Sequence, residues 1–157
     1  NNLAYVSSLR GELNRKLFNF KEAHRWYSHA DSIYAADNTN PWQRSYRMFN
    51  FVVLYYYQGD YRRSLDYTFK ALELRPWLLQ DDGWFSLRTA LAENYYYLNQ
   101  TDSTLYYCNE VQRDSKNKTL AATTSALILL LKARILADNK QYAAAIPLLY
   151  PSVSEVL

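Results

Sequence analysis

Two histidines and one cysteine are the side chains of this sequence best suited to metal binding or nucleophilic chemistry. His24 and His29 lie five positions apart on a predicted helix, a spacing that does not stack them as two metal ligands four positions apart would be stacked. We therefore expect both to be surface or packing residues. Cys108 has no second cysteine to pair with and falls at an inward position between Leu105 and Val111. It predicts a buried structural thiol, with no intrachain disulfide and no cysteine-based zinc site.

Other chemical motifs are equally sparse. The three glycines, at positions 11, 59 and 83, are too scattered to form a phosphate-binding loop. Asp81 and Asp82 stand beside Gly83 in a predicted link, where helix capping explains them. The glycosylation patterns "NQT" at 99 and "NKT" at 117 are short enough to arise by coincidence. We predict no catalytic residue, metal site or cofactor, and therefore no enzyme.

Composition favours helices joined by short links. Hydrophobic residues make up 49% of the 157-residue chain, which supplies ample core, while only 3 glycines and 4 prolines are present for the turns of an all-β protein. The net charge of +3 comes from 18 basic and 15 acidic residues without a basic block, which argues against direct binding of nucleic acid. The longest apolar run, "ALILLL" at 126–131, is too short to insert in a membrane. The compartment is left open between cytoplasm and periplasm.

Tyrosines reveal how the elements must be arranged. The stretch "YYYQGDYRRSLDY" begins at Tyr55 and "YYYLNQTDSTLYY" at Tyr95, so the two triplets are 95 minus 55, or 40, residues apart. Each triplet is followed at the same distance by a further tyrosine, Tyr67 or Tyr107. Equal spacing of this kind predicts a repeated structural unit.

The repeat extends over the whole chain when a small residue in the second helix of each unit is used as a marker. The markers Ala23, Ser64, Thr104 and Ala145 are separated by 41, 40 and 41 residues. A small side chain there lets the second helix approach the first closely. An aromatic residue beside the turn is expected to cover the end of the helix pair; these aromatics are Phe20, Tyr61 and Tyr142. The turn itself uses Gly59 in the second unit, and its place is taken elsewhere by Phe18, Asn99 and Lys140.

The stretch "QGDYRRSLDYTFKALELRP", from Gln58 to Pro76, resembles the second half of a tetratricopeptide repeat, a helix-turn-helix unit. The period here exceeds the roughly 34 residues of that family. We expect the additional residues in "DNTNPWQR", "PWLLQDDGW" and "SKNKTLAATT", as longer loops or extended helices. Longer units of this kind resemble the tetratricopeptide-like sensor domains of bacterial signalling regulators. HEAT repeats are the alternative with a similar period, but they lack the Gly-x-Tyr and Ala-Leu pattern.

The resemblance implies an all-α fold, a right-handed superhelical solenoid of four antiparallel helix pairs in a single domain, 1–157. The expected units are about 1–37, 38–78, 79–118 and 119–157. The sequence begins at Asn1 and stops within a predicted helix, so we expect it to be a segment of a longer protein.

Apolar spacing and capping residues place the helices within these units. The expected ranges are about 3–18, 20–34, 41–57, 60–74, 81–98, 101–113, 120–138 and 141 onward. Asn40 is the expected N-cap before Pro41, and Pro147 is expected to kink or shorten the last helix. In the first helix one apolar stripe contains Leu3, Val6, Leu9, Leu13 and Leu17. This stripe fits the core best if the first turn is one residue longer than the second, and the fourth unit has a similar one-residue ambiguity.

Tetratricopeptide domains usually bind their ligands on a concave face lined by the first helix of each unit, so the resemblance also implies a site. The second unit offers Tyr46, Phe49, Val53, Tyr56 and Tyr57, and the third offers Ser86, Thr89, Glu93, Tyr96 and Tyr97. Tyr55 and Tyr95 take a core-facing position. Arg15, Lys16 and Arg134 are secondary positions at the flanks of the groove.

Tyrosine suits a recognition surface because a rigid ring and a hydroxyl are immobilised through only two torsions, and nearby arginines can hold a carboxylate. The predicted partner is therefore a protein or peptide segment, bound by a sensing or scaffolding part of a larger regulatory protein. Packing between repeats is the other role open to Tyr56, Tyr57, Tyr96 and Tyr97. A structural spacer or self-association module is the second functional hypothesis, and a small-molecule or oligosaccharide binder is the third.

One family activity is not predicted. Tetratricopeptide domains that grip the acidic tail of a chaperone use a clamp of basic and asparagine residues. The corresponding positions hold Ser8, Glu12, Asn50, Ser86 and Ala90. Only Asn50 fits such a clamp.

Overall fold

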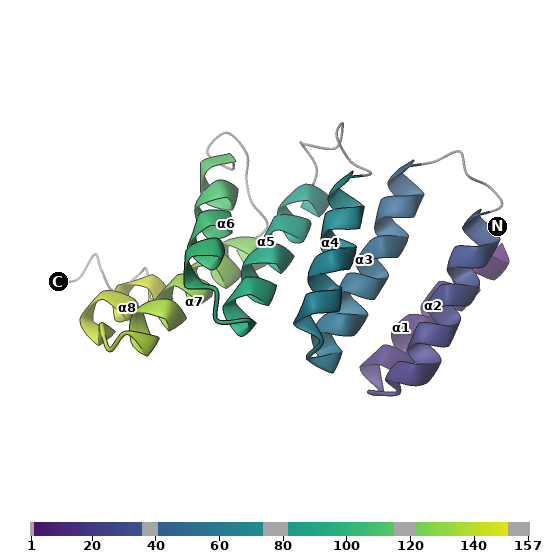
Figure 1. Cartoon of the computed structure of the whole chain (residues 1–157), viewed down its shortest axis with the longest axis horizontal. Coiled ribbons are helices and arrows are strands. Elements are labelled where there is room, and N and C mark those ends of the chain that lie inside the picture. Colours follow the sequence, from purple (N-terminus) through teal and green to yellow (C-terminus); the bar gives the residue numbers. More distant parts are fainter. Residues whose placement is uncertain (1, 36–40, 74–81, 115–121, 151–157) are drawn as a thin grey trace. The chain divides into compact units, whose positions relative to one another are not determined.

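The computed structural model describes residues 2–35, 41–73, 82–114 and 122–150, and this part of the chain consists of helices and their turns, without a strand (Figure 1). The prediction of an all-α fold is confirmed. The helices are α1 (Asn2–Lys16), α2 (Phe20–Ala35), α3 (Pro41–Gln58), α4 (Tyr61–Glu73), α5 (Asp82–Tyr97), α6 (Thr101–Asp114), α7 (Ala122–Asp138) and α8 (Tyr142–Leu149). Their bounds agree closely with the predicted ranges. The caps expected at Asn40 and Asp81, and most of the link residues, lie outside the described residues.

The turn inside each helix pair has the same geometry in all four pairs. Phe18, Gly59, Asn99 and Lys140 have φ angles of 57°, 76°, 58° and 60°, in the left-handed region. After α3, the Gly59 amide donates to the Tyr56 carbonyl and the Asp60 amide to the Tyr55 carbonyl, each at 3.0 Å. The same two bonds recur in the other three turns and form a Schellman-type helix end. The four residues are therefore equivalent, as predicted, whereas the longer first turn and the ambiguity in the fourth unit are not found.

The small marker residues of the four second helices are buried. Ala23, Ser64 and Thr104 are fully buried, and Ala145 is 5% exposed. The Ser64 hydroxyl donates to the Val52 carbonyl of α3 at 3.0 Å, so the two helices of that pair approach within side-chain hydrogen-bond reach. The prediction that the marker permits close packing is confirmed for Ser64, and the burial of the other three markers agrees with it.

The aromatic residues beside the turns differ among the pairs. Phe20 and Tyr61 are partly buried, and the Tyr61 ring meets the Tyr56 ring edge-on at 5.9 Å. Tyr142 was expected to act in the same way but is 60% exposed. The position equivalent to Tyr56 in its pair is Ala137, which has no ring for Tyr142 to contact.

The chain divides into two compact units, Asn1–Leu79 and Gln80–Leu157. Within the first, α1 pairs with α2 and α3 with α4, and α2 packs on α3. The buried cluster of this unit contains Ala23, Tyr27, Phe51, Leu54 and Tyr55. Within the second, α5 pairs with α6 and α7 with α8, while α5 and α6 both pack on α7. The buried cluster of this unit contains Phe85, Ala92, Cys108, Val111, Ile128 and Leu131.

The apolar stripe of α1 was expected to face the core, and this expectation is wrong. Its members are all exposed, from Val6 at 43% to Leu17 at 67%. The buried residues of α1 are instead Ala4, Ser7 and Gly11. The reason is the closeness of α2, because a Cβ added to Gly11 would lie 2.4 Å from Cδ1 of Tyr27. A face of small residues packs there, and the larger apolar residues lie on the outer face.

The last helix is short. α8 spans 8 residues and contains Pro147, whereas α2, α4 and α6 span 16, 13 and 14. The short helix agrees with the prediction, and Pro147, which cannot donate a backbone hydrogen bond, lies inside it. Among the described helices, none combines the length and the apolar character needed to cross a lipid bilayer.

Candidate functional site

The first tyrosine of each triplet stacks on the second helix of its own pair. The Tyr55 and Tyr67 rings lie 5.4 Å apart at an interplanar angle of 28°, and the Tyr95 and Tyr107 rings lie 5.6 Å apart at 4°. Burial raises the pKa of both Tyr55 and Tyr107. Tyr55 is 6% exposed, as predicted, but Tyr95 is only partly buried. Tyr55 is covered further by the His24 ring of α2, which lies 6.2 Å from it.

The second and third tyrosines of each triplet form an edge-to-face pair. The ring centres are 5.6 Å apart for Tyr56 and Tyr57, and 5.4 Å apart for Tyr96 and Tyr97. Tyr57 is 53% exposed and Tyr97 is 37% exposed, whereas Tyr56 and Tyr96 are partly buried. The second tyrosine of each triplet is therefore partly a packing residue, whereas the ring of the third is exposed to solvent.

Arginines from neighbouring helices contact these pairs in both units. The Arg15 guanidinium of α1 lies 4.9 Å from the centre of the Tyr57 ring. In the second unit, Arg134 of α7 donates to the Tyr97 hydroxyl at 3.4 Å, and its guanidinium is 5.9 Å from the Tyr96 ring. Two of the three secondary positions thus lie beside the predicted tyrosines. Lys16, the third, forms an exposed ion pair with Glu12 at 2.9 Å.

The Tyr96 hydroxyl is fixed by a further contact within the second unit. It donates to the Asp138 carboxylate of α7 at 3.1 Å. Burial, together with this carboxylate, raises the pKa of Tyr96. The phenol therefore stays protonated over the physiological range and acts as a donor that ties α5 to α7.

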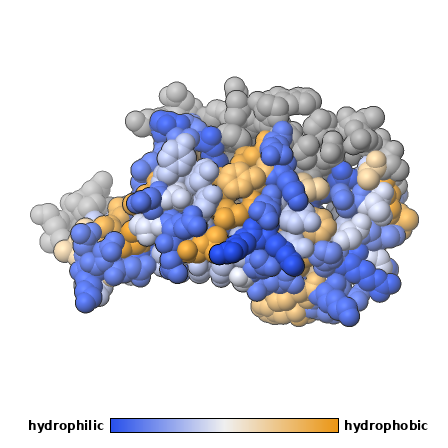
Figure 2. Space-filling view, viewed as in Figure 1, coloured by the Kyte–Doolittle hydropathy of each residue, from blue (hydrophilic) through white to orange (hydrophobic). Residues whose placement is uncertain are grey.

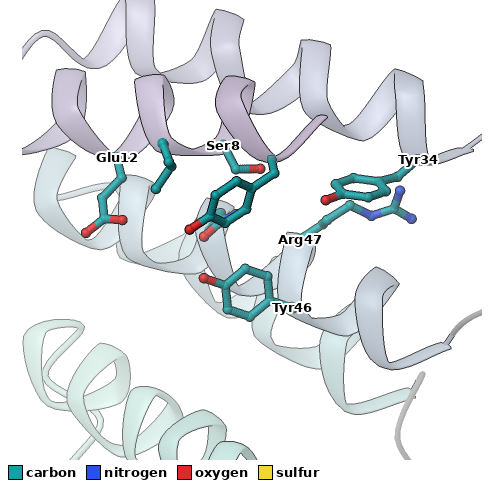
Figure 3. Close-up of a pocket in the computed structure, with 8 residues that line it drawn as sticks. Ser8, Glu12, Tyr34, Tyr46 and Arg47 are labelled. Atoms are coloured by element: carbon teal, nitrogen blue, oxygen red, sulfur yellow. The ribbon is translucent and has the colours of Figure 1, made fainter. Parts of the chain in front are cut away.

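A pocket of about 330 Å³ lies in the first unit between α1, α2 and α3 (Figure 3). Its lining residues are Tyr5, Ser8, Leu9, Glu12, Tyr34, Tyr46, Arg47 and Asn50. Ser8 and Glu12 come from α1 and Tyr46 from α3. Tyr5 is 61% exposed and Tyr46 is 50% exposed, so their rings are accessible at the pocket.

Arg47 forms the inner wall of this pocket. It is 5% exposed, and its Nε lies 3.2 Å from the Asp31 carboxylate of α2. Its guanidinium is 5.2 Å from the Tyr34 ring centre, and Figure 3 shows the two side chains lying against each other. These contacts compensate the charge of Arg47 within the protein. The Glu12 carboxylate is the acidic group of the lining and is partly exposed.

The sequence predicted only part of this pocket. Tyr46 was an expected groove residue, and Ser8, Glu12 and Asn50 are positions of the chaperone clamp that does not fit. Tyr5, Leu9, Tyr34 and Arg47 were missed, and Leu9 had been assigned to the core-facing stripe of α1. Tyr34 was missed because it lies on the second helix of its pair, and only first-helix positions were considered for the site. Tyr5 was missed because the orientation of α1 was predicted wrongly.

The remaining predicted groove residues do not gather into a described pocket. Phe49, Val53 and Glu93 are partly buried. Thr89 is 3% exposed and donates to the Phe85 carbonyl at 2.8 Å, so it belongs to the interior of α5. Of the residues predicted for the groove, Tyr46 therefore lines the pocket, and Tyr57 and Tyr97 have exposed rings.

The residues suited to chemistry have packing roles. The His24 ring meets the Phe51 ring at 5.6 Å, and His29 Nδ1 lies 2.9 Å from the Ser7 hydroxyl oxygen. Cys108 is fully buried, and burial raises the pKa of its thiol to about 11, so the thiol is not an activated nucleophile. Among the residues that the structure describes, no group of acidic, histidine or cysteine side chains is arranged to hold a metal ion.

Charges on α5 and α6 also pair within the protein. Arg88 donates to Glu110 at 2.9 Å and to Asp114 at 2.7 Å, and Arg113 forms ion pairs with the same two carboxylates. In the view of Figure 2, hydrophilic residues prevail and smaller hydrophobic areas interrupt them.

Comparison with known proteins adds no assignment: we found no family model, curated protein or solved structure that matches this chain.

Proposed function

We propose that this chain is an interaction module that binds a segment of a protein or peptide partner on the surface shared by α1 and α3. The four equivalent turns and the four buried marker residues support a tetratricopeptide-like array. In such an array the pairs stack into a right-handed superhelix, and the first helices line its concave face. The module would serve as the sensing or scaffolding part of a larger regulatory protein, as the resemblance of the second repeat implies.

The pocket between α1 and α3 is the observation that carries this proposal. Its volume of about 330 Å³ is at the lower end of the roughly 300–1,000 Å³ typical of ligand sites, a size that suits an anchoring side chain of a peptide. Tyr5 and Tyr46 supply accessible rings, and Glu12 and Asn50 supply polar groups on two helices. A rigid aromatic rim with a few polar groups is the composition of a binding hot spot.

Selection of binding peptides from a displayed random library tests the proposal. We expect peptides that bind the purified chain and lose at least about tenfold in affinity with Tyr46→Ala, because truncating an aromatic anchor removes about 1.4 kcal/mol or more. Tyr106→Ala is the matched control, since Tyr106 is 58% exposed on α6 and lies outside the pocket.

Circular dichroism of both variants shows whether they keep the fold of the parent chain. The proposal is refuted if no peptide is enriched, or if affinity falls equally in the two variants.

A further inference from the structure

The pocket between α1, α2 and α3 presents tyrosine rings on two of its helices. Tyr5 of α1 is 61% exposed, Tyr46 of α3 is 50% exposed, and both line the pocket. The face of a tyrosine ring carries partial negative charge, so it attracts a cation that lies within about 6 Å of the ring centre. Two accessible rings beside one pocket therefore favour a positively charged occupant.

Contacts of this kind already occur within the first unit. The Arg15 guanidinium lies 4.9 Å from the centre of the Tyr57 ring. In the wall of the pocket, the Arg47 guanidinium lies 5.2 Å from the centre of the Tyr34 ring. The tyrosines of this unit thus receive cations at the distance that the attraction requires, and one such contact is part of the pocket.

Glu12 supplies negative charge to the same pocket. Its side chain lines the pocket from α1 and is 44% exposed. The carboxylate pairs at 2.9 Å with Lys16, one turn further along the helix, and the Lys16 side chain is 64% exposed. An exposed pair of this kind is weak because water screens both charges. A cation in the pocket can therefore take the place of Lys16 at Glu12 with little loss.

Arg47 does not make the pocket a site for an anion. Its side chain is 5% exposed, its Nε lies 3.2 Å from the Asp31 carboxylate, and a terminal nitrogen donates to the Asp31 carbonyl at 3.4 Å. Figure 3 shows Arg47 with Tyr34 at one side of the pocket and Glu12 at the other. An acidic occupant would meet the charge of Glu12 and an arginine that Asp31 already compensates.

We propose that the pocket receives a lysine or arginine side chain of the partner, which lies between the Tyr5 and Tyr46 rings with its charge beside Glu12. This inference rests on the proposed function, since it names the chemistry of the side chain that anchors the bound segment. The rings hold the aliphatic stem and attract the charge, and the carboxylate accepts its hydrogen bonds. The partner segment is therefore basic at its anchor.

Peptides selected from the displayed library test this chemistry directly. Among those whose affinity falls with Tyr46→Ala, we expect each to contain a lysine or arginine at its anchor. Replacing the anchor lysine by norleucine, or the anchor arginine by citrulline, removes the charge and keeps the length of the side chain. Either replacement should lower the affinity at least about tenfold. Exchange of lysine for arginine should cost less, and its direction shows which of the two the pocket prefers.

Three variants of the chain test the role of Glu12. Glu12→Gln should lower the affinity about three- to tenfold, and the loss should shrink as salt is added. Glu22→Gln is the matched control, because Glu22 pairs with Arg25 on α2 at 3.6 Å and lies outside the pocket. Lys16→Gln breaks the same ion pair as Glu12→Gln but keeps the carboxylate, so it should not weaken binding.

The possible results separate this inference from the proposed function. The inference is overturned if peptides that depend on Tyr46 contain no basic residue, or if norleucine and citrulline bind as well as lysine and arginine. It is also overturned if Lys16→Gln weakens binding as much as Glu12→Gln, since the ion pair would then matter only for α1. Each of these results leaves a peptide site that depends on Tyr46. If no peptide is enriched, the proposed function fails and this inference fails with it.

Discussion

Gly11 offers a sharp test of how closely α1 and α2 approach, through the substitution Gly11→Ala. Gly11 lies within α1, and the buried ring of Tyr27 covers it. At an ordinary exposed helix position, this substitution stabilises by about 1 kcal/mol because alanine loses less backbone entropy than glycine. The position inside this helix pair is expected to reverse the sign.

The magnitude follows from the distances at the contact. A Cβ on residue 11 would lie 2.4 Å from Cδ1 and 2.5 Å from Cε1 of Tyr27, whereas carbon atoms in good contact are about 3.5–4.0 Å apart. The ring is 3% exposed and also meets the Phe51 ring at 5.9 Å, so it has little room to move. Overpacking of this kind costs about 1–3 kcal/mol. After the propensity gain, we expect a net loss of about 1 kcal/mol in the free energy of unfolding.

Urea unfolding followed by circular dichroism measures this loss, and a second background provides the control. In Tyr27→Leu the ring is absent, so Gly11→Ala should stabilise that background by about 1 kcal/mol. The two substitutions should therefore be coupled by about 2 kcal/mol in a double-mutant cycle. If Gly11→Ala stabilises the parent chain as much as it stabilises Tyr27→Leu, the close approach of α1 and α2 is refuted.

Two further predictions concern the turns and the buried thiol. Lys140→Gly should stabilise the chain by about 0.5–1 kcal/mol in thermal unfolding, because a left-handed φ costs a non-glycine residue about 1–2 kcal/mol and the greater backbone entropy of unfolded glycine offsets part of this gain. Asn99→Gly should raise the stability by less, since asparagine tolerates this conformation. Equal stabilisation by the two substitutions would contradict the reasoning. The Cys108 thiol loses its proton at its ordinary pKa of 9.0 when unfolded but near pH 11 when folded, so its contribution to stability is complete below pH 9 and is lost as pH rises to 11. Urea unfolding at a series of pH values should show this part of the fall, about 2–3 kcal/mol, in the parent chain but not in Cys108→Ala.

The repeat was predictable from the sequence because residues of similar size recur at equivalent positions, where the packing within each helix pair limits their size. The markers must be small wherever two helices cross closely, and Ala23, Ser64 and Thr104 satisfy this requirement. Helix ranges followed from apolar spacing, caps and Pro147. The equal spacing of Tyr55 with Tyr67 and of Tyr95 with Tyr107 showed that the two stretches are equivalent, but the stacking of these rings was not predicted.

The pocket was predictable only in part because its residues come from three helices that are distant in the sequence. Tyr46 was found through the repeat position. Tyr34 and Arg47 were not, since their contact depends on how α2 packs against α3 and not on any local pattern. A separate error concerned Tyr95, whose burial depends on its neighbours on other helices as well as on its place in the repeat.

By itself, the sequence determined that the chain is helical, where its helices lie and which positions of the four pairs are equivalent, because these features depend on local spacing and on side-chain size. The tertiary structure decided which face of α1 packs. Periodicity identified one face of α1, the stripe of larger apolar residues, and hydrophobicity favoured that face for the core. A Cβ at position 11 would collide with the Tyr27 ring, so Gly11 permits α2 to pack on the small residues of α1, and Leu13 is left at the surface. Steric fit between the helices therefore outweighs the hydrophobic pattern of α1.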